Sequence, residues 1–291
     1  MSIARFVSLA AATIALVTAA QTAAAQATFE RIKSRGEIHI GYRPVAQPFS
    51  MDDASGKPTG YAVEFCNAIA ERIPALTGGV SKIRYIPVDA DRRILLLREG
   101  QIDMMCGSLT VTKERNAVLA FSTPIFYDNV QVMVRARDNI TALEQLKDQS
   151  VVVINTTTAN QALGTWSSAK GAGLKVTRAV GAEAALAQLQ LGWVKGYARD
   201  GVLLASQKNS LPNAADFNIL PAPLSLEPIA IGIRRGDTAM KLLADSVVAN
   251  AMKTGTMQTW YSKYFLSPTP SGKSLNIPMS DRLKEQIQAA R

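Results

Sequence analysis

The chain has 291 residues, 47% of them hydrophobic and 19% charged, so it can bury a large core and is not a disordered polypeptide. Its net charge is +9, but the basic residues are spread thinly and do not alternate with aromatic residues. This pattern argues against nucleic acid as a partner and favours small acidic partners or anionic surfaces. One histidine, His39, and two distant cysteines do not make a metal-ligand set, and no cofactor is predicted.

Residues 1–27 have the layout of a secretory signal peptide. Arg5 supplies an early positive charge, an apolar stretch follows, and small residues allow cleavage after Ala25 or Ala27. The apolar stretch contains polar residues and is shorter than the ~20 residues that span a bilayer, so a membrane anchor is the weaker alternative. No cysteine follows the stretch, which excludes lipid attachment at a new N-terminus. We therefore expect export to the periplasm, and we expect the exported protein to be a monomer.

Cys66 and Cys106 are the only cysteines of the chain. In an oxidising compartment the two are expected to form one disulfide. Two buried free thiols are the alternative.

The first half of the chain alternates segments typical of strands and helices. Thr59 is expected to cap a helix with an apolar stripe at fourfold spacing, and Asp89 is expected to cap a shorter helix that ends at Gly100. Strands are expected around these helices at 37–42, 83–88 and 102–106. This βαβαβ order predicts a parallel sheet covered by helices.

The same rhythm restarts at residue 151. Strands are expected at 151–154, 175–177 and 194–198, and helices at 182–191, from 237 onward and from Thr254 onward. Two similar βαβ blocks predict two lobes rather than a single sheet. The segments 130–135 and about 224–233 are extended, apolar and without helix signals, so they are expected to connect the lobes.

Parallel sheets bind ligands at the carboxyl ends of their strands, so residues that directly follow the predicted strands are candidates for a site. Arg115 can give a carboxylate two parallel charge-assisted hydrogen bonds. Ser108 and Thr110 offer hydroxyl groups that donate or accept. These three residues all follow the predicted strand 102–106.

Other strand ends add complementary groups. A threonine turn that includes Thr157 and Thr158 precedes a helix, whose free N–H groups favour an anion. Asp200 can pair with an ammonium group, so the set describes an α-amino acid. Arg43 and Arg93 are then left to bind a second acidic group. Each residue also has a plainer interpretation, as a solvated arginine or a helix cap, and the hypothesis rests on all strand ends together.

Several motifs in this order and spacing resemble extracellular solute-binding protein family 3, the polar amino-acid binding proteins of ABC importers. The similarity extends from about Phe29 to the C-terminus and is greatest to the glutamate/aspartate-binding branch. The motifs that carry it are Ile38–Arg43, Pro48–Ser50, Gly56–Cys66, Gly100–Ser108, Glu114-Arg115, Ala120–Pro124 and Trp260–Phe265.

The resemblance implies an α/β, type II periplasmic-binding-protein fold. Each of two lobes would hold a mostly parallel sheet flanked by helices, and two hinge strands would join the lobes. The expected boundaries are 28–133 and 227–291 for the first lobe and 134–226 for the second. The lobes would close over an α-amino acid, acidic in this branch, and deliver it to an inner-membrane ABC permease. The protein would then be a binding protein and not an enzyme.

The resemblance also assigns roles to the candidate residues. Arg115 and Thr110 would hold the α-carboxylate, with help from Thr157 or Thr158 across the cleft. Ser108 and Asp200 would hold the α-ammonium. The basic residues that read an acidic side chain correspond to Arg43 and Arg93.

The chain departs from the branch at several positions. It has Ala90 in place of serine, Ala182 in place of a polar residue or histidine, and Gly201 in place of a second acidic residue; Lys195 and Arg199 in the preceding segment are unusual. These changes keep amino-acid capture but leave open a larger or differently shaped anionic amino acid.

Two other function classes remain as alternatives. One is a periplasmic enzyme similar to cyclohexadienyl or arogenate dehydratases, for which Glu183 and Asp91 are the only loose candidates for a general acid. The other is a ligand-sensing module for a membrane receptor, which sequence does not separate from a transport role.

Overall fold

The computed structural model describes residues 28–79, 82–268 and 273–291. The predicted signal peptide lies outside these residues. Within them, no helix has the length and apolar character that crossing a bilayer requires.

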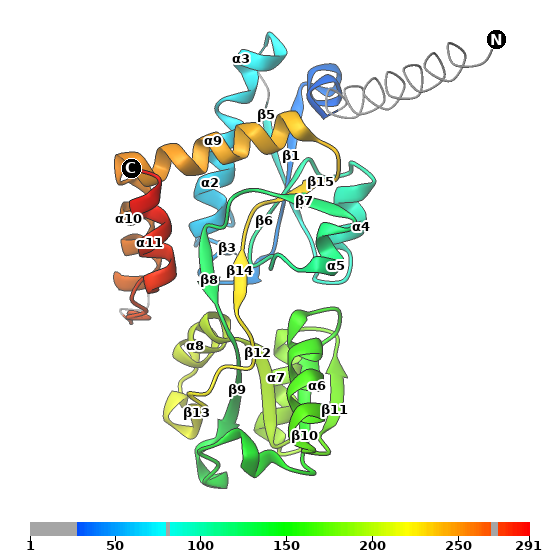
Figure 1. The fold of residues 1–291 in the computed structure, drawn as a ribbon, viewed down its shortest axis with the longest axis vertical. Helices are drawn as coiled ribbons and strands as arrows, with labels where there is room; N and C mark the ends of the chain where they lie inside the picture. The colour runs from blue at the N-terminus through cyan, green and yellow to red at the C-terminus, as the bar shows by residue number, and fades with distance from the viewer. Residues whose placement is uncertain (1–27, 80–81, 269–272) are drawn as a thin grey trace, which may run out of the picture.

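The first lobe is built on a five-stranded sheet in the order β5-β1-β6-β15-β7 (Figure 1). β1 runs parallel to β5 and β6, whereas β15 runs antiparallel to β6 and β7. The strands are β1 (Glu37–Tyr42), β5 (Lys82–Pro87), β6 (Met104–Cys106), β7 (Leu119–Phe121) and β15 (Gly232–Arg234). A small separate sheet contains β2 (Val45–Ala46), β3 (Ser50–Asp52) and β4 (Pro58–Thr59).

The helices of this lobe come from both ends of the described chain. They are a helix at 28–35, α2 (Tyr61–Ala70), α3 (Ile73–Thr77), α4 (Arg93–Arg98), α5 (Lys113–Asn116), α9 (Thr238–Thr254), α10 (Thr256–Tyr261) with a π-helical turn at Ser262–Leu266, and α11 (Asp281–Ala289). α2 buries Tyr61, Phe65 and Ile69, the apolar stripe predicted from sequence.

The second lobe has its own sheet in the order β11-β10-β12-β9-β13. Its strands are β9 (Val130–Arg135), β10 (Ser150–Ile154), β11 (Lys175–Ala179), β12 (Gly196–Asp200) and β13 (Phe217–Ile219). Three helices flank the sheet, α6 (Thr158–Lys170), α7 (Ala182–Leu191) and α8 (Gly201–Ser210). Short 3-10 turns at Ala136–Asp138, Leu143–Leu146 and Ala214–Asp216 complete the lobe.

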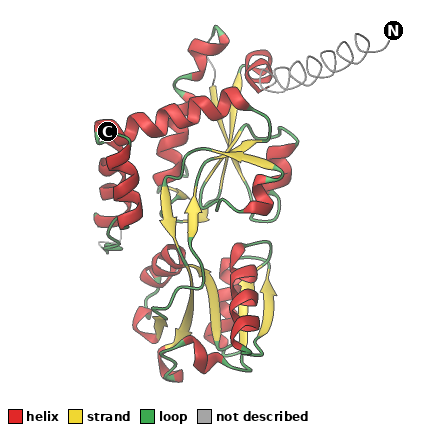
Figure 2. Ribbon diagram, in the orientation of Figure 1, coloured by secondary structure: helices red, strands yellow, loops and turns green. Residues whose placement is uncertain are grey.

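Two short antiparallel strands, β8 (Phe126–Asp128) and β14 (Glu227–Ile229), form the hinge between the lobes. Figures 1 and 2 show both strands crossing between two bodies, each with strands flanked by helices. The predicted α/β, two-lobed fold is confirmed.

The prediction that 130–135 connects the lobes is wrong. These residues are β9, which pairs with β12 along most of its length and with β13 on its other side. The crossing strand is β8, so the chain changes lobe near Asn129 and not at the predicted boundary of residue 133. β9 is an inner strand with most residues buried, and such a strand has the same apolar pattern as a hinge segment.

Four local predictions also need correction. The N-cap of α2 is Gly60 and not Thr59, because its φ of 135° suits glycine and an added Cβ would lie 2.4 Å from the Phe49 carbonyl oxygen. Asp89 does not cap α4, whose N-cap is Arg92. β12 begins two residues later than expected and therefore includes Arg199 and Asp200. Thr254 ends α9 rather than starting a helix; the next helix, α10, begins at Thr256, and α11 follows it as the last described helix.

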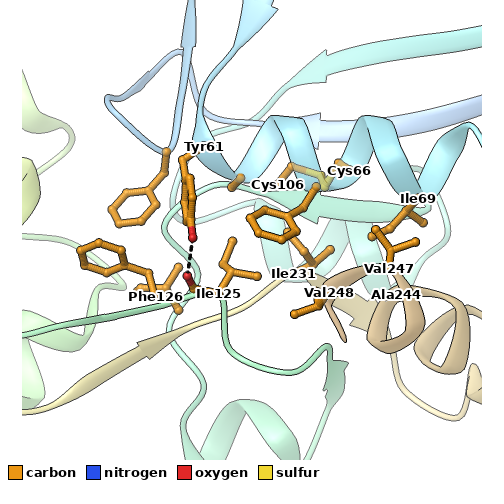
Figure 3. Packing of buried hydrophobic residues seen from close by; sticks show 14 of the residues in the cluster. Tyr61, Cys66, Ile69, Cys106, Ile125, Phe126, Ile231, Ala244, Val247 and Val248 are labelled. Carbon is orange, nitrogen blue, oxygen red and sulfur yellow. Dashed lines mark hydrogen bonds between the residues drawn. A yellow bond between two sulfur atoms is a disulfide. The ribbon is translucent and has the colours of Figure 1, made fainter. Parts of the chain in front are cut away.

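A disulfide joins α2 to β6 through Cys66 and Cys106, as the cysteine count predicted. Figure 3 shows the bridge among buried apolar side chains of α2, β6 and α9, with the Tyr61 hydroxyl donating to the carbonyl oxygen of Ile125 at 2.9 Å. The bridge therefore ties a helix of the first lobe to the strand that leads into the candidate site.

Removing this bridge is expected to destabilise the protein without changing the fold. The two cysteines are 40 residues apart in sequence, and closing a loop of that size stabilises by about 4 kcal/mol in the chain-entropy model. Urea unfolding of the Cys66→Ser/Cys106→Ser double variant should show this loss, and reductant should affect only the parent protein. A loss below about 1 kcal/mol would contradict the prediction.

Candidate functional site

The loop after β6 carries three of the predicted site residues and is fixed to the hinge. Thr110 forms a bridge with Ile229 of β14. The Thr112 hydroxyl caps α5 by accepting from the backbone N–H of Arg115 at 3.1 Å, and the Arg115 Nη1 donates to the Thr110 carbonyl at 2.9 Å. The Ser108 hydroxyl is buried without a hydrogen-bond partner in the described residues. This loop therefore holds a guanidinium and a free hydroxyl beside the hinge strand.

Arg43 and Arg93 are buried in the same lobe. Arg43 directly follows β1, where the Ser50 hydroxyl accepts from its backbone N–H at 3.1 Å and donates to its carbonyl at 2.8 Å. Arg93 begins α4, and its Nη1 donates to the Ser108 carbonyl at 3.1 Å. The Nε of both arginines is buried without a partner among the described residues. Ser50 thus fixes the backbone of Arg43, the Ser108 carbonyl holds the side chain of Arg93, and part of the donor capacity of both arginines remains free.

Burial disfavours the charged form of these guanidinium groups. It lowers the pKa of Arg43 to about 10, with the charge of Arg199 as the next cause. It lowers the pKa of Arg93 well below its ordinary value, followed by the charges of Arg115 and Arg43. The buried arginines therefore repel one another, and binding of an anion among them is favoured.

Asp200 comes from the second lobe, at the end of β12. It occupies the N-cap position of α8, but its side chain makes no capping hydrogen bond. Asp128 of the hinge takes over that role, since its carboxylate accepts from the backbone N–H of Val202 at 3.3 Å and of Asn129 at 2.8 Å. The buried Asp200 carboxylate is therefore left available for another partner.

Two hinge residues that sequence reasoning missed belong to the same cluster. Asp128 and Glu227 lie directly opposite each other in the β8–β14 pair, and both are buried. Glu227 Oε1 accepts from the Ser225 hydroxyl at 2.6 Å, while Oε2 is buried without a partner in the described chain. Burial and then the charge of Glu227 raise the pKa of Asp200, and burial and then the charge of Asp200 raise that of Asp128. The signal that could have identified these residues is that each hinge strand carries a single acidic residue within an apolar stretch of sequence.

The charge of Asp200 acts on the buried arginines of the first lobe. Burial lowers the pKa of Arg115, and the charge of Asp200 is the strongest effect that opposes this shift. The same charge opposes the shift at Arg93. No carboxylate lies within 4.0 Å of Arg43, Arg93 or Arg115 in the part of the chain that the structure describes. The opposing groups thus act on each other electrostatically without direct contact.

Thr157 and Thr158 lie at the N-terminus of α6 in the second lobe. Thr157 is the N-cap residue and donates its hydroxyl to the Ile154 carbonyl at 2.7 Å, and both threonines are half-buried. Gln161, in the same part of α6, lies beside Glu114 of α5. The pKa of the Glu114 carboxyl is lowered first by the backbone N–H of Glu114 itself, then by Thr112, and further by Gln161. The start of α6 therefore faces the loop of Arg115, although no hydrogen bond joins the threonines to the other candidate residues.

A second contact between the lobes involves Arg199, which sequence reasoning noted as unusual but did not assign to the site. Its Nη2 donates to the Val45 carbonyl in the first lobe at 3.1 Å, and its Nη1 donates to Gln207 Oε1 at 3.0 Å. The predicted site residues Arg43, Arg93, Ser108, Thr110, Arg115 and Asp200 are all buried where the lobes meet.

The arrangement is suited to binding a charged small molecule. It offers guanidinium groups, a hydroxyl and a carboxylate from opposing lobes, which is the donor and acceptor set of a zwitterion. Glu183 and Asp91, the candidates for a general acid, are both exposed. Among the residues described, no group of three or more His, Cys, Asp or Glu side chains is arranged to hold a metal ion.

The chain is similar in sequence to known amino-acid-binding proteins. The chain is 29% identical over 268 residues to a glutamate/aspartate import solute-binding protein of Salmonella typhimurium, which covers 91% of this chain and 89% of the relative. It is 30% identical over 263 residues to an L-glutamate/L-aspartate-binding protein of Pseudomonas aeruginosa, with 89% and 87% covered. These relatives are named as binding proteins, not as enzymes.

Solved structures show the same fold. An ancestral arginine-binding protein bound to arginine superimposes with a TM-score of 0.70 at 29% identity, covering 79% of this chain and 98% of that one. A solute receptor for L-cysteine from Neisseria gonorrhoeae gives a TM-score of 0.71 at 26% identity, with 82% and 93% covered. The model of the bacterial extracellular solute-binding proteins, family 3, matches residues 38–267, and the chain belongs to this family of binding proteins.

Proposed function

We propose that the protein binds an acidic α-amino acid, similar to glutamate or aspartate, between its two lobes and delivers it to an ABC permease in the inner membrane. The observation that carries the proposal is a set of buried guanidinium groups without a carboxylate partner. None of Arg43, Arg93, Arg115 and Arg199 has a carboxylate within 4.0 Å in the described residues, although each is at most 8% exposed. Unpaired buried charges are costly, so the site favours an anion.

The charge balance of the site supports an acidic ligand. Four buried guanidinium groups face three buried carboxyl groups, those of Asp128, Asp200 and Glu227. With all seven ionised, one positive charge is left over. An amino acid with an acidic side chain carries a net charge of −1 and neutralises it. A neutral amino acid leaves the excess unchanged, and arginine doubles it.

The geometry and the family resemblance support the following proposed role for each residue. Arg115, held beside Thr110, binds the α-carboxylate, and the N-terminus of α6 with Thr157 or Thr158 approaches it from the other lobe. Asp200 and the free hydroxyl of Ser108 bind the α-ammonium. The second acidic group of the ligand is left to Arg43 and Arg93.

Binding would act through closure of the lobes. Each lobe supplies only part of the ligand contacts, so the ligand binds the closed form more tightly than the open form and shifts the population toward it. The closed shape is then the form that a permease recognises. Residues 1–27, with the layout of a signal peptide, support delivery to the periplasm.

Calorimetric titration tests the proposal. The protein is first unfolded and refolded so that any co-purified ligand is removed. Glutamate or aspartate is expected to bind about 100-fold or more tightly than glutamine, because the amide leaves a buried guanidinium unpaired. Arginine is expected to bind more weakly still. Tightest binding of arginine or of a neutral amino acid would overturn the proposal.

A further inference from the structure

Two guanidinium groups approach each other from opposite lobes in the region next to Asp200. Arg43 follows β1 in the first lobe, and Arg199 lies in β12 of the second lobe. The Nη2 of Arg199 donates across the lobes to the carbonyl of Val45, two residues after Arg43, at 3.1 Å. Each arginine is only 5% exposed. Closing the lobes therefore brings two like charges into a poorly solvated space.

Neither charge has a carboxylate within 4.0 Å in the described residues, although the charge of Asp200 acts on both at longer range. The side chain of Arg43 donates no hydrogen bond within the described residues, and its Nε is buried. Arg199 donates only to neutral acceptors, the Val45 carbonyl and Gln207. The charge of Arg199 also lowers the pKa of Arg43, second only to burial. Repulsion between buried like charges is strong because little water screens it.

Buried donor groups beside this pair have no partner in the described residues. The Tyr197 hydroxyl lies two residues before Arg199 on the same face of β12, and it is buried without a well-aligned hydrogen bond to any described residue. A cavity of about 310 Å³ between the lobes is bordered by Val45, Glu183 and Arg199 among others, but not by Arg43 or Tyr197. The Tyr197 hydroxyl and the Arg43 Nε are thus two buried donors near Arg199 that no described protein group uses.

We propose that Arg43 and Arg199 clamp the side-chain acid group of the ligand between the lobes, with Tyr197 donating to it, and so make closure depend on that group. This inference rests on the proposed function and deepens it, since it assigns specificity to two residues of the second lobe. An acidic ligand turns the repulsion into attraction from both lobes. A neutral ligand leaves the two guanidinium groups facing each other, which opposes closure.

The Arg199→Met variant tests the clamp, with calorimetric titration of glutamate and glutamine as the measurement. The glutamate-to-glutamine affinity ratio is expected to fall about 10-fold or more, partly because glutamine binds more tightly once the repulsion is gone. If Arg199 had only a structural role, the variant would bind glutamate and glutamine more weakly by the same factor. Arg178→Met is the matched control, because it removes a charge from an exposed position of the same sheet, and it should leave the ratio unchanged.

The Tyr197→Phe variant keeps the test decisive if Arg199→Met does not fold. Loss of the hydroxyl alone should lower the affinity for glutamate about 5- to 10-fold and leave the affinity for glutamine unchanged. If the parent protein prefers glutamate but the variants that fold keep its ratio, the clamp is overturned and the proposed function stands. If the parent protein does not prefer an acidic amino acid, both are overturned.

Discussion

Replacing Arg115 with alanine is expected to abolish measurable binding of an acidic amino acid. The guanidinium is buried and donates to the Thr110 carbonyl, while the Thr112 hydroxyl accepts from the backbone N–H of Arg115. Without it, the α-carboxylate of the ligand would be desolvated without a cationic partner. Breaking such a buried pair costs about 3–5 kcal/mol, which corresponds to a loss of affinity of about 100-fold or more. Calorimetric titration with glutamate measures this loss.

The matched control is Arg98→Ala, which removes an exposed arginine from α4 in the same lobe. It should bind as the parent protein does. Near-parental affinity in Arg115→Ala would show that this guanidinium does not hold the ligand.

Replacing Asp200 with asparagine is expected to weaken binding and to stabilise the empty protein. The side chain makes no capping bond that asparagine would lose. It lies near Asp128 and Glu227, and burial followed by the charge of Glu227 raises its pKa. Losing the partner of a buried ammonium costs about 2–5 kcal/mol of binding energy. Removing an unfavourable buried charge should raise the melting temperature by about 2–4 °C for each kcal/mol recovered.

The pH dependence of this stabilisation follows from the direction of the shift. A carboxyl whose pKa is higher in the folded than in the unfolded state destabilises the fold as the pH rises above its ordinary value of about 4. Below that value the group is protonated in both states and the penalty disappears. The gain in Asp200→Asn should therefore be present at pH 7 and shrink toward pH 4.

Thermal melts of the parent and variant proteins at both pH values provide the measurement, with Asp91→Asn as an exposed control. A lower melting temperature in Asp200→Asn at pH 7, or an equal gain at both pH values, would contradict the account.

Regular periodicity made most elements of the fold predictable. The expected strand 37–42 and helix 182–191 match β1 and α7 at both ends. β9 was misassigned because an inner strand buried on both faces has no polar alternation to mark it. The helix starts at Gly60 and Arg92 were also missed, since neither residue caps with its side chain.

The candidate site residues that follow strand ends could be predicted from the sequence. Those that come together only when two distant strands pair could not. Arg43, Ser108 and Arg115 follow parallel strands, whose carboxyl ends meet at one edge. Their roles in binding remain predictions. Asp128 and Glu227 come together only through the pairing of two hinge strands 99 positions apart in sequence. No local pattern reports such a pairing.

The second lobe shows a further limit of sequence reasoning. A shift of two residues in β12 moved Arg199 from an expected loop into the strand. Its side chain then lies on the face of Tyr197 and reaches across to Val45. The contact depends on how the two lobes meet, which neither lobe encodes alone.

A crystal structure of the protein with bound glutamate would show whether Arg115 and Asp200 hold opposite ends of the ligand. We expect one ligand between the lobes, its α-carboxylate bonded to Arg115 and its ammonium within about 3.2 Å of Asp200. Its side-chain carboxylate should contact the guanidinium of Arg43. A ligand bound elsewhere, or one that leaves Arg115 and Asp200 without contact, would contradict it.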